Sequence, residues 1–153
     1  MGASGWDYFT PYQQDVSAAL AAAHERAFSE GDYFWLYDGR WGSPERPRPS
    51  TIEELWEDEG VRHSFTHSVL DIFRVLGQGE EPEVCSARPL TAEEITRVLG
   101  SLWPTRADFE RIHEEAYEEL DGLIEERGYA CYTVLYDEQR HPSEIVFWGV
   151  TGD

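Results

Sequence analysis

The pattern of apolar and polar residues near the start of the chain predicts a helix followed by a strand. Apolar side chains recur at helical spacing between residues 12 and 27. Thr10 and Pro11 suit an N-cap and a first helical position, and Gly31 is typical of a helix end. The aromatic run at residues 33–37, bounded by polar residues and glycine, is typical of a short strand.

The middle of the chain alternates loops with helical patterns. Three prolines in residues 42–50 predict an extended surface loop. Ser50 and Glu53 have the spacing of a capping box, which would open a short helix. Apolar residues at helical spacing then predict a longer helix over residues 61–76, and residues 83–88 suit a short edge strand.

The last third of the chain predicts two more helices and a hairpin. Thr91 and Glu94 form a second capping-box pattern at the start of a short helix. Residues 105–127 carry the clearest apolar stripe and predict the longest helix. Residues 129–136 and 144–150 have the composition of two strands, and the short loop between them favours an antiparallel hairpin.

These elements predict a single α+β domain over residues 1–153, with four to five helices packed on a small antiparallel sheet. There is no apolar run long enough to span a membrane, and the N-terminus has no secretion signal. We therefore expect a cytoplasmic protein that does not enter membranes. Its two cysteines, Cys85 and Cys131, should stay reduced in that compartment.

The charge of the chain changes this picture most. It has 31 acidic residues against 12 basic ones and a formal net charge of −19. Such a surface repels nucleic acid and anionic membranes, and it attracts a basic protein or a cationic ligand. All basic residues are arginine, and lysine and asparagine are absent.

The missing residue types have two explanations that the sequence leaves open. Lysine and asparagine codons are rich in A and T, so their absence indicates a bacterium with a GC-rich genome. The segments Trp6–Tyr12 and Phe147–Asp153 resemble parts of small proteins from such bacteria, a resemblance that implies no activity. A salt-rich cytoplasm would also favour an acidic surface without lysine.

The face of the predicted helix 105–127 opposite the apolar stripe is almost wholly acidic. Carboxylates four residues apart on a helix repel one another, so a run of them destabilises the helix. Such a run is favoured only if its negative electrostatic field serves to attract a partner. Trp41, beside the proline-rich loop, has the character of an exposed interface anchor. The candidate partner-binding residues are Glu110, Glu114, Glu118, Asp121, Glu125 and Trp41.

Histidines provide the candidate chemistry. His113 lies in the apolar stripe one turn from Tyr117, so these two residues are the candidate catalytic pair of an aromatic pocket. A core histidine bonded to a backbone carbonyl is the structural alternative for His113. His63, His67 and Asp71 recur every four residues and are candidate metal ligands along one helix, or else a solvated polar face.

No nucleotide-binding, zinc-protease or nucleophile-elbow motif is present, and no cofactor is expected. Two hypotheses follow. The first is an acidic, non-catalytic binding protein that engages a basic partner, as immunity, mimic or sequestering proteins do. The alternative is a small enzyme or ligand-binding domain with an aromatic pocket around His113 and Tyr117.

Overall fold

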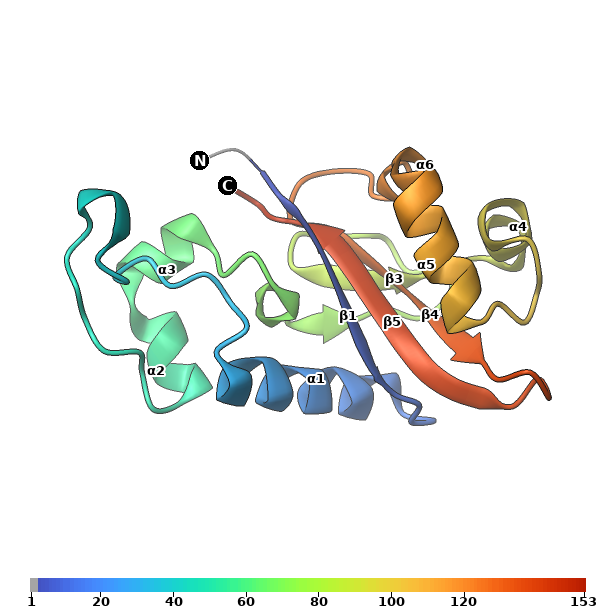
Figure 1. Ribbon diagram of the computed structural model, residues 1–153, viewed down its shortest axis with the longest axis horizontal. Coiled ribbons are helices and arrows are strands. Elements are labelled where there is room, and N and C mark those ends of the chain that lie inside the picture. Colours follow the sequence, from blue (N-terminus) through green and yellow to red (C-terminus); the bar gives the residue numbers. More distant parts are fainter. Residues whose placement is uncertain (1–2) are drawn as a thin grey trace.

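The computed structural model describes residues 3–153, which form one α+β domain around a five-stranded sheet (Figure 1). Residues 1 and 2 of the predicted domain lie outside this description. The strand order is β1-β5-β4-β3-β2. The strands are β1 (Gly5–Pro11), β2 (Arg74–Val75), β3 (Ser86–Pro89), β4 (Ala130–Tyr136) and β5 (Pro142–Val150).

The sheet is mixed, so the prediction of a purely antiparallel sheet is wrong. Strands β1, β5 and β4 pair antiparallel, as the predicted C-terminal hairpin requires. Strands β4, β3 and β2 pair parallel. The segment predicted as an edge strand, now β3, lies inside the sheet because β2 covers its outer side.

Six α-helices occur in the described chain, one more than the predicted upper limit. Thr91 caps α4 with the complete capping box that the sequence predicts. Thr105 caps α5 with a further capping box, closed by Asp108, which was not predicted. Among the helices of residues 3–153, none has both the length and the apolar character that crossing a bilayer requires. The helices are α1 (Val16–Glu30), α2 (Ile52–Glu57), α3 (Glu59–Ser64), α4 (Ala92–Glu94), α5 (Arg106–Glu115) and α6 (Tyr117–Asp121), and shorter turns are η1 (Arg40–Gly42), η2 (Val69–Asp71) and η3 (Ile95–Leu99).

The start of the chain corrects the first prediction. Thr10 and Pro11 end β1 and do not begin a helix, because side chains of residues 5–11 alternate between exposed and buried positions. Helix α1 begins later, where the Asp15 side chain accepts a hydrogen bond from the Ser17 N–H at 3.0 Å. The aromatic run 33–37 is irregular backbone and not a strand.

Two predicted helices are interrupted by backbone geometry. The one over residues 61–76 stops at Ser64, since Phe65 and His67 both have positive φ values that a right-handed helix cannot contain. The helix over residues 105–127 breaks at Ala116, whose φ of −148° and ψ of 50° separate α5 from α6. Neither interruption involves glycine or proline.

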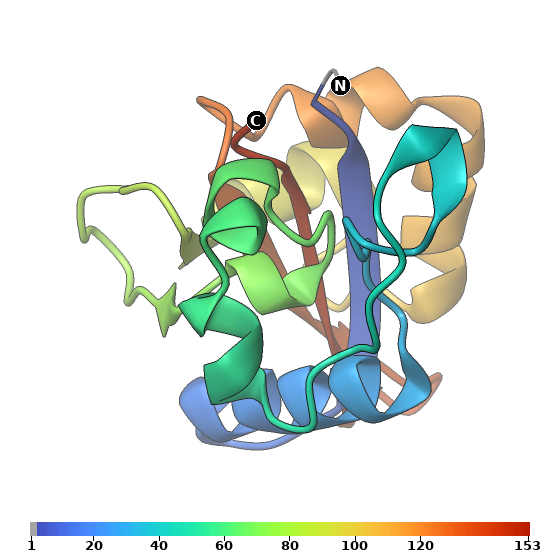
Figure 2. The same cartoon turned by 90° about the vertical axis from the view of Figure 1, so that its left-hand side faces the viewer.

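Strand β5 divides the apolar core into two clusters. Ile145 and Phe147 face the cluster under α1, α2 and α3. Val146 and Trp148 face the other cluster, under η3, α5 and α6. The two views show α1 along one side of the sheet and α5 and α6 on the opposite side (Figures 1 and 2).

Gly149 tests how tightly this central strand is packed. A Cβ at this position would lie 2.7 Å from Cζ2 of Trp6 and 2.9 Å from the Tyr129 carbonyl oxygen. We therefore expect Gly149→Ala to lower the free energy of unfolding by about 1–3 kcal/mol, measured by urea denaturation. Gly77→Ala is the matched control, because its Cβ would meet only Oε1 of Glu80 at 3.4 Å. Equal stability of the two variants would contradict the packing argument.

Candidate functional site

The predicted acidic residues lie on α5, α6 and the turn that follows, and they are exposed. Two have arginine partners: Glu110 contacts Arg106 at 2.8 Å, and Glu119 lies 3.9 Å from Arg97. The other carboxylates of the group form no ion pair within the described chain. We call this group the acidic α5–α6 surface; it consists of Glu110, Glu114, Glu115, Glu118, Glu119, Asp121, Glu125 and Glu126.

His113 and Tyr117 remain neighbours although the helix breaks between them. Their rings meet edge to face at 5.2 Å. His113 Nε2 lies 3.2 Å from the Asp7 carboxylate on β1, and 40% of the His113 side chain is exposed. His113 is therefore at the margin of the core and not inside it. Burial, followed by the charges of Asp121 and Asp7, raises the pKa of Tyr117.

The Tyr117 hydroxyl packs directly against the backbone of β1 at Gly5. It occupies the space above Gly5, where a Cβ would overlap the phenol oxygen. Two cavities of residues 3–153 border β1, and both are lined by Asp7 but by neither His113 nor Tyr117. In the structure the two rings pack against each other, and His113 lies beside the exposed Asp7 carboxylate.

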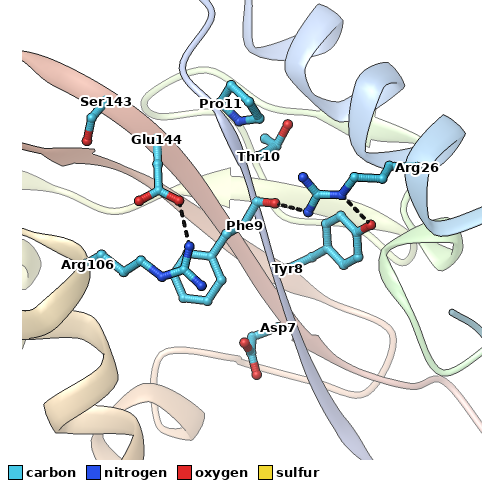
Figure 3. A pocket seen from close by; sticks show the side chains of 9 residues that line it. All are labelled: Asp7, Tyr8, Phe9, Thr10, Pro11, Arg26, Arg106, Ser143 and Glu144. Atoms are coloured by element: carbon cyan, nitrogen blue, oxygen red, sulfur yellow. Dashed lines mark hydrogen bonds and ion pairs between the residues drawn. The ribbon is translucent and has the colours of Figure 1, made fainter. Parts of the chain in front are cut away.

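A cleft of about 390 Å³ lies across β1 and holds two arginines (Figure 3). Arg26 of α1 donates hydrogen bonds to the Tyr8 hydroxyl, at 3.0 Å, and to the Phe9 carbonyl oxygen. Arg106 of α5 lies over the Phe9 ring and contacts Glu144 at 3.0 Å. Arg26 has no carboxylate partner in residues 3–153, so this side of the cleft can attract an anion.

The candidate metal ligands do not share a helix. His63, in the last turn of α3, is exposed, and its Nδ1 lies 2.8 Å from the Glu59 carbonyl oxygen. His67 follows the break at Phe65, and Asp71 is buried in η2. Within residues 3–153, no group of three histidine, cysteine or acidic side chains is placed to hold a metal ion.

Trp41 is 97% exposed, as an anchor at an interface would be. It sits in the left-handed region with φ of 55°, between Gly39 and Gly42. Two arginines of the adjoining proline-rich loop pack on aromatic rings. Arg46 lies over the Tyr37 ring and Arg48 over the Tyr33 ring.

Cys85 and Cys131 are both free thiols in the structure. Burial raises the pKa of Cys131 to about 12, so this thiol stays protonated. Cys85 is half-buried, and burial together with the charge of Asp71 also raises its pKa.

One constellation has no counterpart in the sequence analysis. The Ser4 hydroxyl lies 2.5 Å from His67 Nδ1, and His67 Nε2 lies 3.3 Å from the Asp153 carboxylate. Because these residues are separated by 63 and 86 positions, no local motif could reveal them. The sequence could have indicated the cluster only through pairing of strands at the two ends of the chain. That prediction would have required residues 5–11 to be recognised as a strand.

Comparisons of the chain with protein-family models, with curated proteins and with solved structures give no match.

Asp71 supports a prediction about pH. Its Oδ1 accepts hydrogen bonds from the N–H and the hydroxyl of Thr66 at 2.7 and 2.6 Å, while Oδ2 is buried without a partner in the described chain. Burial raises the pKa of Asp71 above its ordinary value near 3.8. The folded state then binds this proton more tightly than the unfolded state, so stability falls as the pH rises through the folded pKa.

We expect Asp71→Asn to remove that part of the pH dependence. Urea denaturation of the wild type and of the variant, in steps from about pH 4 to 7, measures the difference. The free energy of unfolding should decline less with rising pH in the variant. Identical pH slopes would contradict a raised pKa at Asp71.

Proposed function

We propose that this chain is a binding protein that engages a basic partner through the acidic α5–α6 surface. The observation that supports it most is the exposure of eight carboxylates on one short stretch, only two of which have arginine partners. Carboxylates that are neither buried nor paired keep their field directed to the solvent, where it attracts cations over about a Debye length.

The use of the arginines supports the same proposal. Arg26, Arg46, Arg48, Arg106 and Arg140 lie over aromatic rings. Three of these, namely Arg26, Arg48 and Arg140, have no carboxylate partner in residues 3–153, so they do not neutralise the acidic side chains. Binding of this kind needs complementary charge and no covalent chemistry. It should be fast at low salt and should weaken as salt screens the field.

Charge neutralisation at matched positions tests the proposal. We expect Glu114→Gln, Glu118→Gln and Asp121→Asn together to slow association by about tenfold at low ionic strength. The control changes Glu25, Glu57 and Glu81 to Gln, which alters the net charge equally on α1, α2 and a loop. Stopped-flow kinetics would measure the association rate constants of both triple variants. The binding probes are a lysine-rich peptide and any protein captured by crosslinking in the native cell.

The two triple variants separate a docking surface from a general effect of net charge. A larger loss for the α5–α6 triple than for the control supports the proposal. Equal losses, or no salt-dependent association with either probe, would refute it.

A further inference from the structure

Ser4, His67 and Asp153 meet at the end of the sheet where β1 begins and β5 ends. The Thr151 N–H donates a hydrogen bond to the Ser4 carbonyl oxygen at 3.0 Å, and the Ser4 N–H donates to the Thr151 hydroxyl at 2.9 Å. These bonds extend the β1–β5 ladder and bring Ser4 close to Asp153. The chain reversal at Phe65 and His67 then places the imidazole between them.

The surroundings of His67 define which ring nitrogen carries the proton. Nε2 faces two groups that can only accept, the Ser64 carbonyl oxygen at 3.1 Å and the Asp153 carboxylate at 3.3 Å. Nε2 is therefore the protonated nitrogen of the neutral ring. The lone pair of Nδ1 is left facing the Ser4 hydroxyl, which is the arrangement in which a histidine can take a proton from serine.

Asp153 is suited to stabilise a positive charge on this ring. Its side chain and that of His67 are each only 14% exposed. Oδ1 of Asp153 is buried and has no hydrogen-bond partner in residues 3–153, so the imidazole is the polar group that its carboxylate faces. A mostly buried carboxylate placed in this way lies against the positive charge that the ring acquires when it takes the serine proton.

A cavity of about 400 Å³ adjoins the cluster, and His67 is part of its wall. Arg48 lines the same cavity, where it lies over the Tyr33 ring and donates hydrogen bonds to the carbonyl oxygens of Gly31 and Tyr33, at 3.2 and 3.3 Å. It has no carboxylate partner within the described chain. Its remaining N–H groups can bind an anionic group of a ligand.

A donor for a developing oxyanion is also close in sequence. The backbone of Tyr12 bonds to Ser143 of β5, and that of Ser4 bonds to Thr151 just beyond β5. Backbone groups alternate sides along an antiparallel strand, so the even-numbered residues of β1 face β5. The N–H of Gly5 therefore points away from β5, at the open edge of the sheet. The N–H of the residue after a nucleophilic serine is a common oxyanion donor.

We propose that Ser4, His67 and Asp153 form a catalytic triad that hydrolyses small carboxylic esters carrying a second anionic group. This activity goes beyond the proposed binding function and lies on different residues. Ser4 is the nucleophile, His67 the general base and acid, and Asp153 the carboxylate that orients and stabilises the imidazole.

The reaction balances with water as the only co-reactant. Ser4 Oγ bonds to the ester carbonyl carbon while its proton passes to His67 Nδ1, and the π electron pair moves onto the carbonyl oxygen. When that pair returns, the alkoxide leaves and takes the proton from Nδ1 as an alcohol. Water then attacks the acyl group and gives a proton to Nδ1, which returns it to Ser4 Oγ as the carboxylic acid departs.

Covalent labelling of the wild-type protein is the first test, because it needs no variant to fold. We expect a fluorophosphonate to add one mass increment per chain, located on Ser4 by peptide mass spectrometry. Hydrolysis of 4-nitrophenyl hemisuccinate should fall at least about a hundredfold in Ser4→Ala. Ser17→Ala, which changes an exposed serine of α1, is the matched control and should keep the wild-type rate.

Two further variants separate catalysis from a structural role. Arg48→Gln should reduce kcat/KM for the hemisuccinate more than for neutral 4-nitrophenyl acetate. Asp153→Asn should lower kcat, with labelling of Ser4 slowed in parallel. No label on Ser4 of the folded wild type, or equal hydrolysis by wild type and Ser4→Ala, would overturn the proposal and leave the cluster as a clamp between β1 and β5.

Discussion

The antiparallel ladder between β1 and β5 is the constraint on which the rest of the structure depends. It joins residues 5–11 to residues 144–150, almost the full length of the chain apart. Since β5 is buried on both faces, this pairing fixes the two core clusters relative to each other. It also positions the polar groups of interest: Asp7 reaches His113 on one face, and Ser4 is held near Asp153 at one end.

The charges of the molecule are divided between scaffold and surface. Arginine guanidinium groups lie over aromatic rings and bond to backbone oxygens, where a planar delocalised cation is stabilised by both contacts. Arg88 instead forms two hydrogen bonds with Glu94 at 2.9 Å and helps lower the pKa of that carboxyl to about 2. Six other arginines also lie within 4.0 Å of a carboxylate: Arg40, Arg46, Arg74, Arg97, Arg106 and Arg111. Most other carboxylates have no such partner and remain in contact with solvent, so the acidity that dominates the composition also dominates the surface.

Local signals in the sequence were sufficient for elements that local interactions determine. The capping box at Thr91 and the β4–β5 hairpin depend on residues close in sequence, and the structure confirms them. The failures arise where tertiary contacts override a local pattern. Pro11 is as compatible with the end of an edge strand as with the start of a helix, so the local pattern could not distinguish the two. The helical spacing of apolar residues over 61–76 does not reveal the left-handed backbone at His67. The acidic surface was visible from composition, whereas the Ser4–His67–Asp153 cluster required the pairing of distant segments.

The closeness of Ser4 and Thr151 has a topological consequence for the folding of this protein. A short linker could join the two ends of the described chain without disturbing the ladder between them, while new ends could be opened at the exposed turn around Gly42. In such a circular permutant β1 would follow β5 directly, as the third strand of a meander. The pairing that now closes the longest loop in the molecule would become a local contact, with a smaller entropic barrier to its formation.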